Sequence, residues 1–270
     1  MPSSSYEITF PAVRQFTADV GKLSKEKHTI QAFIEVDVTD ALARIKTLRS
    51  PAYKVSFLAW FIKVLVDTVE HHPPVNGIKK GRKRVVVFKQ VDVSTIFEKL
   101  VEQVAVPLPL VVRRANAKSP LQISQEIQDA VNQPLQNQKS PGVGAGDNKL
   151  LIMLGLILPQ WLRLFIMRNL ILRNPKRMQA TMGTVLVTSL GTVGQISTWI
   201  LPTSIHPLSI GIGTLVKKPY LVGGEVQSRQ ILHLTVALDH DVIDGMPARA
   251  FIADLVDRLS RGYALEYRPQ

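Results

Sequence analysis

The sequence predicts an α+β fold, in which helices are layered on a largely mixed sheet. Apolar runs of strand length occur in both halves of the 270-residue chain, and segments with apolar residues at helical spacing lie between them. The two kinds of segment do not alternate strictly, as they would in a doubly wound parallel fold. Apolar residues make up 46% of the chain, which is enough for a sizeable core. We expect a single domain over residues 1–270, with an insertion of loop and apolar helix at about 133–180.

The expected strands are short apolar or alternating runs bounded by polar or turn residues. They cover residues 28–36, 84–89, 91–96, 104–112, 184–189, 208–216 and 231–239. The expected helices have apolar residues at i, i+3 and i+4. They cover about residues 39–48, 56–70, 119–131 and 245–259. Ser119, Pro120 and Gln122 form a capping-box sequence at the start of the third helix, and Gly262 is a natural stop for the last.

The insertion combines a polar segment with an apolar one. Residues 133–148 are polar and contain prolines and glycines, which predicts an exposed loop. The apolar segment Leu150–Leu172 is interrupted by Pro159 and by arginines, whereas a membrane-spanning helix needs roughly twenty apolar residues. Three interpretations remain open, namely contact with a membrane surface, a buried helical hairpin, and an apolar cover over a substrate channel. In the first, Trp161 would lie among lipid headgroups. The lipid phosphates would then contact Arg163, Arg168, Arg173, Lys176 and Arg177.

Charge and residue usage limit the partners and the chemistry. The formal net charge of +12 suits nucleic acid, an anionic membrane surface or a phosphate-rich ligand. The sequence contains no nucleic-acid-binding signature, so we expect no nucleic acid partner. Because the chain has no cysteine, it can form neither a disulfide nor a thiolate nucleophile. Its six histidines show no metal-ligand spacing, so we expect no metal. The N-terminus lacks a secretory signal pattern, which favours a cytoplasmic protein, either free or peripheral to the membrane.

His240 is the strongest candidate for a catalytic residue. It follows an apolar strand at 231–239 and precedes the turn Asp244-Gly245, which opens a helix. Side chains alternate along a strand, so His240 continues the Leu/Val side and should point into a buried or half-buried space. Burial favours the neutral imidazole, which can accept a proton as a general base. The alternative is a core histidine bonded to a backbone carbonyl.

The segment Leu234–Gly245 resembles the active-site segment of the 2-oxoacid dehydrogenase acyltransferase (dihydrolipoamide acyltransferase) catalytic domain, a family with the chloramphenicol acetyltransferase-like fold. Further segments resemble this family in the same order along the chain. They are Ile34–Thr39, His72–Asn76, Val91–Ser94, Ser119–Ala130 and Val187–Gly194.

The resemblance implies a coenzyme A-dependent acyltransferase that transfers an acyl group directly in a ternary complex, with His240 as general base. Thr188 would donate a hydrogen bond to the oxyanion, an interaction typically worth about 3 kcal/mol. Asp244 would belong to the catalytic set and form a structural ion pair with Arg14, which would hold the histidine loop in register. The resemblance also implies a homotrimer, in which His240 and Thr188 meet across a subunit boundary, with higher assembly open.

The chain also departs from the family pattern. Asp241 stands where the family usually has arginine, and either orients the imidazole or faces solvent. No lipoyl domain precedes the core in this sequence, so we expect a stand-alone form that carries no lipoyl group. The apolar segment Leu150–Leu172 suggests a long-chain acyl group or a membrane-borne acceptor. The alternative from another class is a non-catalytic trimeric scaffold that keeps the acyltransferase fold.

Overall fold

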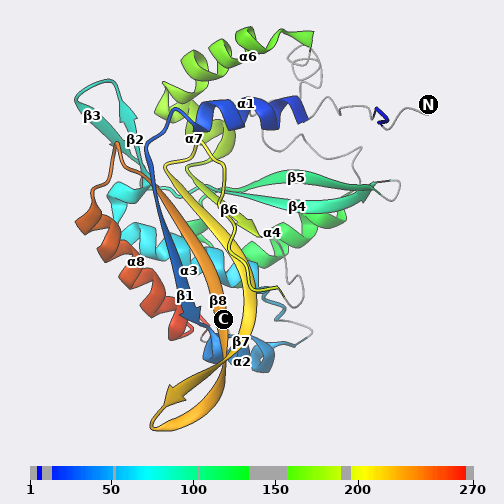
Figure 1. Cartoon of the computed structure of the whole chain (residues 1–270), viewed down its shortest axis with the longest axis vertical. Coiled ribbons are helices and arrows are strands. Elements are labelled where there is room, and N and C mark those ends of the chain that lie inside the picture. Colours follow the sequence, from blue (N-terminus) through cyan, green and yellow to red (C-terminus); the bar gives the residue numbers. More distant parts are fainter. Residues whose placement is uncertain are drawn as a thin grey trace.

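The computed structural model describes residues 5–7, 14–50, 53–101, 104–133, 157–189 and 196–265. Within these residues a six-stranded sheet has the order β1-β8-β7-β6-β4-β5, and β2 and β3 form a separate hairpin (Figure 1). The strands are β1 (Thr29–Asp37), β2 (Gly77–Lys80), β3 (Arg84–Val87), β4 (Val93–Val101), β5 (Val104–Val112), β6 (Val185–Ser189), β7 (Leu208–Val222) and β8 (Glu225–Asp239). Because β6 pairs in parallel with β4 and β7 while the other pairs are antiparallel, the sheet is mixed, as predicted.

Helices pack on the sheet and at one end of it. The α-helices are α1 (Arg14–Ser24), α2 (Thr39–Leu48), α3 (Phe57–His71), α4 (Pro120–Asn132), α6 (Gln160–Ile166), α7 (Pro175–Met182) and α8 (Gly245–Ser260). The shorter turns are the 3₁₀ helices η1 (Pro73–Asn76) and η2 (Ala115–Ala117) and the π-helical turn η3 (Met167–Leu172). The apolar α3 is almost entirely buried and packs against α4 and α8, so it forms the centre of the helical layer. The capping box at α4 is confirmed, since the Ser119 and Gln122 side chains both form their expected bonds.

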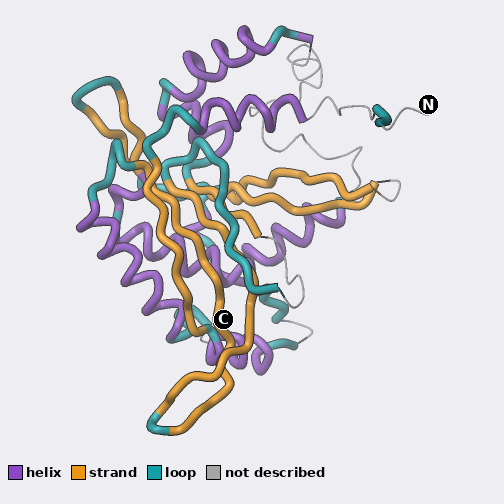
Figure 2. The backbone as a smooth tube through the Cα atoms, in the orientation of Figure 1, coloured by secondary structure: helices purple, strands orange, loops and turns teal. Residues whose placement is uncertain are grey.

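A loop from residue 196 to 207 covers the sheet opposite the helices, along β7 (Figure 2). The loop approaches so closely that a Cβ on Gly211 would lie 2.3 Å from the carbonyl oxygen of Ile200. On Gly213, a Cβ would lie 2.3 Å from the carbonyl oxygen of Thr198. The Trp199 ring in this loop stacks on His233 of β8, with centroids 3.9 Å apart. Because both faces of the sheet are covered, every residue from 231 to 239 is buried.

We expect Gly211→Ala to destabilise the fold by about 3 kcal/mol, because the new methyl group would push the backbone of the covering loop away from β7. Gly21→Ala is the matched control. This glycine lies in α1 and has open space at its Cβ position, so alanine should be neutral or slightly stabilising. Urea unfolding of both variants measures the difference. Equal stabilities would mean that the loop does not pack on β7 as described.

The described part of the insertion, residues 157–180, packs against α1 instead of standing free. Asp19 of α1 is fully buried, and its carboxylate accepts hydrogen bonds from Arg163 Nε at 2.7 Å and Gln160 Nε2 at 2.9 Å. Arg168 pairs with Glu26 just beyond α1. The expectation that Arg163 reaches lipid phosphates is therefore wrong, because Arg163 is buried against a carboxylate of the chain itself. Arg168 is exposed and forms its ion pair at the surface.

Residues 134–156, which include the predicted loop and the first part of the apolar run, lie outside the described residues. Among the described residues, no helix is both long enough and apolar enough to cross a membrane.

Candidate active site

His240 lies directly after β8, as the first residue of a turn. Its backbone N–H donates to the carbonyl oxygen of His28 at 2.7 Å, which ties the turn to the residue before β1. Its side chain is 45% exposed, so the imidazole lies half-buried at the surface of the single chain. The core histidine of this region is not His240 but His233 of β8, which is fully buried beneath Trp199.

Asp244 lies beside the imidazole. Its Oδ1 is 3.9 Å from Nδ1 of His240, which is close enough for electrostatic attraction but too long for a hydrogen bond. The Asp244 side chain is 90% exposed and starts α8. Within the described chain no ion pair joins Arg14, the first residue of α1, to Asp244. The structure therefore brings Asp244 to His240 but does not pair it with Arg14.

Asp241 neither orients the imidazole nor merely faces solvent. Its Oδ1 lies 3.2 Å from Nδ1 of His28, and its Oδ2 lies 3.6 Å from Nζ of Lys79 on β2. The hydrogen bond to His28 and the charge of Lys79 hold the pKa of Asp241 below its ordinary value. Asp241 thus anchors the turn to β2.

A second carboxylate, that of Asp239, also holds the turn in place. Asp239 lies 2.5 Å from Nζ of Lys27, and its Oδ1 accepts a hydrogen bond from the backbone N–H of Asp241 at 3.1 Å. The backbone N–H of Asp239 donates to the carbonyl oxygen of Pro207 at 2.9 Å. These contacts give His240 a defined backbone position although its ring is half exposed.

His206 supports this arrangement and was missed by the sequence reasoning, because a histidine before proline carries no periodic signal. Its Nε2 lies 3.0 Å from the carbonyl oxygen of Met182, so Nε2 carries the proton. Its Nδ1 then accepts a hydrogen bond from Ser204 Oγ at 2.8 Å. Burial of the ring lowers the pKa of His206 to about 4. The neutral ring thus fixes His206 in place. The next residue, Pro207, provides the carbonyl oxygen that accepts the hydrogen bond from the backbone N–H of Asp239.

The depressed pKa of His206 predicts that the protein loses stability in acid. The ordinary pKa of histidine is 6.5, so between about pH 6.5 and pH 4 this imidazole is protonated in the unfolded chain but stays neutral in the folded one. The free energy of unfolding should therefore fall by at most about 2 kcal/mol from pH 7 to pH 5, and be fully regained above pH 7. Urea unfolding at both pH values tests this against His206→Gln, which should lack this part of the pH dependence. If the stability of the wild type and of His206→Gln depended equally on pH, the assignment of a lowered pKa to His206 would be contradicted.

Thr188 is the next to last residue of β6. Within one chain it lies far from His240. Thr188, Gly211 and Thr235 lie in one row across β6, β7 and β8. His240 comes five residues after Thr235 in the sequence. At about 3.3 Å per residue and about 4.8 Å between strands, the Cα atoms of Thr188 and His240 are roughly 20 Å apart. One chain therefore does not bring the two predicted catalytic side chains together.

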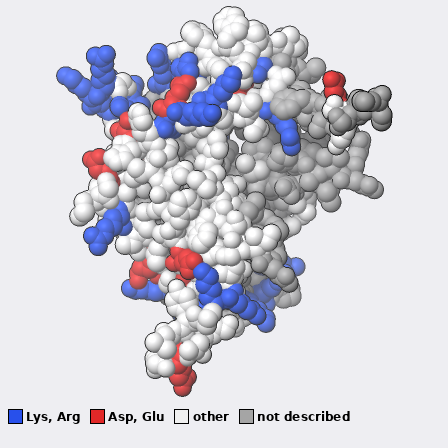
Figure 3. All heavy atoms as spheres, viewed as in Figure 1, with Lys and Arg blue, Asp and Glu red and all other residues white. Residues whose placement is uncertain are grey.

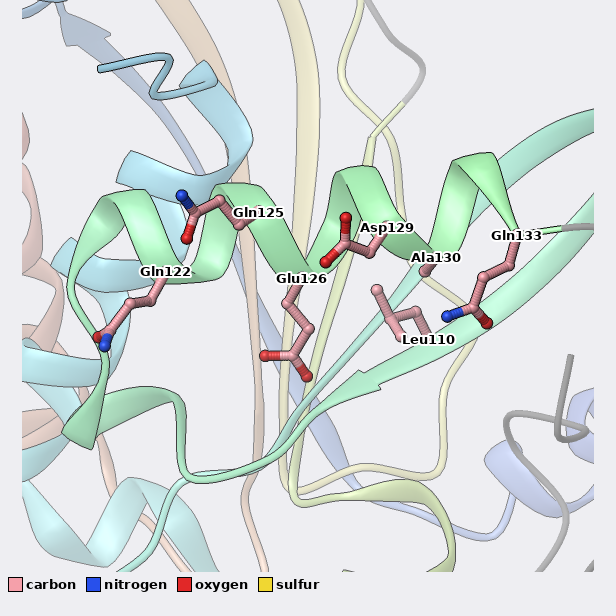
Figure 4. A pocket seen from close by; sticks show the side chains of 7 residues that line it. All are labelled: Leu110, Gln122, Gln125, Glu126, Asp129, Ala130 and Gln133. Atoms are coloured by element: carbon pink, nitrogen blue, oxygen red, sulfur yellow. The ribbon is translucent and has the colours of Figure 1, made fainter. Parts of the chain in front are cut away.

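A hollow of about 480 Å³ between α4 and β5 does not contain the predicted catalytic residues. Figure 4 shows that most of its lining side chains are polar and come from α4 or the residue after it, while Leu110 belongs to β5. Two of its residues, Glu126 and Asp129, are acidic, and Glu126 already pairs with Lys118. Such a hollow does not suit a phosphate-rich ligand. No cluster of three or more carboxylate or imidazole side chains that could hold a metal ion occurs in the described part of the chain.

Comparisons with known proteins give consistent results. A family model described as 2-oxoacid dehydrogenases acyltransferase (catalytic domain) matches residues 3–144 and 173–265. The chain is 23% identical over 257 residues to the dihydrolipoyllysine-residue acetyltransferase component of the pyruvate dehydrogenase complex of Bacillus subtilis, covering 90% of this chain and 49% of that protein. It thus spans about half the length of this curated relative.

Two solved structures define the fold. Chloramphenicol acetyltransferase superposes with a TM-score of 0.50 at 12% identity, covering 94% of this chain and 100% of that one, so the fold is chloramphenicol acetyltransferase-like. Dihydrolipoamide acetyltransferase from Azotobacter vinelandii superposes with a TM-score of 0.68 at 17% identity, covering 97% and 94%. In that enzyme a serine, a histidine and an asparagine were investigated for their role in catalysis. The serine lies 52 residues before the histidine, and the asparagine four residues after it.

Proposed function

Since the chain belongs to the family of 2-oxoacid dehydrogenase acyltransferase catalytic domains, we propose that it is a coenzyme A-dependent acyltransferase that moves an acyl group directly between two bound thiols. One observation carries this proposal. Thr188 lies 52 residues before His240 and Asp244 four residues after it, the spacings of the serine, histidine and asparagine investigated in the Azotobacter vinelandii enzyme. The equal spacings support the proposal that a hydroxyl, an imidazole and a polar neighbour occupy corresponding positions in this chain.

The proposed reaction needs no covalent intermediate on the protein, in line with the absence of cysteine. His240 removes the proton from the attacking thiol, and the resulting thiolate adds to the thioester carbonyl. The hydroxyl of Thr188 donates a hydrogen bond to the tetrahedral oxyanion. When the intermediate collapses, the second thiolate leaves and takes the proton back from His240. The acyl group has then moved from one sulfur to the other.

Asp244 is proposed as a positioning residue for His240. Its carboxylate lies 3.9 Å from Nδ1 and attracts a proton at that nitrogen. The lone pair of Nε2 is then free to accept the proton of the thiol. This role differs from the ion pair with Arg14 that the resemblance implied.

The complete site is proposed to form between two copies of the chain in a trimer. A general base and an oxyanion donor must each lie within hydrogen-bond distance of the reacting groups. The separation of roughly 20 Å between Thr188 and His240 in one chain is too large for this. A neighbouring copy would therefore supply the Thr188 that faces His240, and it would cover the exposed side of the imidazole.

The direct test is acyl transfer from acyl-coenzyme A to dihydrolipoamide by the purified chain, with the S-acyl product separated by chromatography. We expect turnover with at least one acyl group and a rise in melting temperature on adding coenzyme A. A panel of acyl chain lengths tests the long-chain hypothesis, which a strict preference for acetyl would contradict. The absence of both turnover and thermal shift would favour the non-catalytic scaffold and overturn the proposal.

A further inference from the structure

The segment of the insertion that follows residue 156 carries an exposed apolar face. The family model does not match residues 145–172, so this face is not explained by the family. Trp161 and Phe165 are one helical turn apart on α6 and are 68% and 57% exposed. Ile157 and Leu170 are exposed beside them. We call these four residues the apolar cap. Monomeric proteins rarely expose such a group of large apolar side chains unless it docks on something.

The apolar cap is held firmly on the rest of the molecule. Arg163, on the other side of α6, is buried and binds Asp19 of α1 and the carbonyl oxygen of Leu158. Arg168 pairs with Glu26 and so fixes η3. These contacts explain why α6 cannot turn its apolar face inward: the opposite face is occupied by buried polar bonds. The exposure of Trp161 and Phe165 is thus built into the packing.

Positive charge lies at the same end of the molecule as the apolar cap. Residues 157–189 carry five Lys or Arg residues, and residues 77–89 carry six, while neither range contains a single Asp or Glu. The helix α7 packs against both η3 and β2, so the two ranges share one end of the molecule. Exposed cations there that form no ion pair with a described residue include Arg173, Lys176, Arg177, Lys80, Arg82, Lys83 and Arg84. We call these seven the cationic collar.

Figure 3 shows an uncharged surface at this end, with Lys and Arg gathered below it together with a few Asp or Glu atoms, and further Lys and Arg at the tip of the β2–β3 hairpin. From this arrangement we propose that the apolar cap and the cationic collar dock on the surface of an anionic lipid bilayer. An aromatic-rich apolar face enters the headgroup region, and the surrounding cations bind lipid phosphates. A second copy of the chain is a poor partner for this surface. A symmetric contact through this end would place the two cationic collars, which have like charge, against each other.

The test is flotation of the full chain with vesicles of phosphatidylcholine, either alone or mixed with phosphatidylglycerol. We expect binding to the mixed vesicles, little binding to phosphatidylcholine alone, and release at high salt. Lys80→Gln, Arg82→Gln and Lys83→Gln together should weaken binding at least about tenfold. Trp161→Ser with Phe165→Ser should do the same through loss of the apolar contact. Trp161 fluorescence should shift to the blue when the mixed vesicles bind.

The matched control is Leu221→Ser with Val226→Ser, at the tip of the β7–β8 hairpin at the opposite end of Figure 1. These side chains are 73% and 74% exposed, so their loss should leave vesicle binding unchanged. Equal binding to both kinds of vesicle, or equal loss in the control, would overturn the proposal. A smaller oligomer for the Trp161→Ser, Phe165→Ser variant in sedimentation would instead assign the apolar cap to contact between copies. The proposal does not depend on the proposed acyl transfer, because none of these residues belongs to the catalytic set.

Discussion

Replacing His240 with alanine is expected to lower kcat about a thousandfold. A positioned general base typically contributes 10²–10⁴-fold. The two flanking carboxylates are engaged elsewhere, Asp241 with His28 and Asp239 with Lys27. Because the thiol would still bind, KM for acyl-coenzyme A should change only a few-fold. Steady-state kinetics of acyl transfer give both constants.

The same variant should remain folded. The imidazole is 45% exposed and forms no side-chain hydrogen bond within the described chain, so its loss should change the free energy of unfolding by less than about 0.5 kcal/mol. His71→Ala, an exposed histidine near the end of α3, is the matched control and should keep full activity. If His240→Ala kept more than about a tenth of the wild-type kcat, the imidazole would not be the base.

Thr188→Val should lower kcat by about 10²–10³-fold, because valine keeps the shape of threonine but lacks the hydroxyl that would bond to the oxyanion. Thr188→Ser restores the donor and should stay within about tenfold of the wild type. KM should change little in both variants, since the oxyanion exists only after the thiolate has added. Equal rates for the valine and serine variants would exclude Thr188 as the oxyanion donor.

The sequence predicted the parts of the fold that have strong local signals. The capping box at Ser119 and the helix after Gly245 are set by short-range patterns, and both appear where expected. The long β7–β8 hairpin was predicted too short, because residues 217–230 extend beyond the core and lack an apolar pattern. The helix α1 was missed by the sequence reasoning; its two buried residues are a carboxylate, Asp19, and an apolar residue, Leu23.

The sequence indicated a candidate residue for the site but not the surroundings of that residue. His240 was singled out because a strand, a turn and a helix follow one another around it in the sequence. The partners of Asp241, namely His28 and Lys79, lie more than 150 residues away, so no local pattern could indicate them. Arg163 looked like a cation available to lipid because its partner, Asp19, is 144 residues away.

The most direct measurement of the central claim is complementation between two inactive variants. Chains carrying His240→Ala and chains carrying Thr188→Val are co-expressed with different tags, and trimers that contain both are isolated. Each site needs an intact His240 from one copy and an intact Thr188 from the neighbour, so every mixed trimer has one intact site of three and should recover about a third of the wild-type activity, far above either variant alone. No recovery in trimers shown to contain both chains would contradict a site shared between subunits.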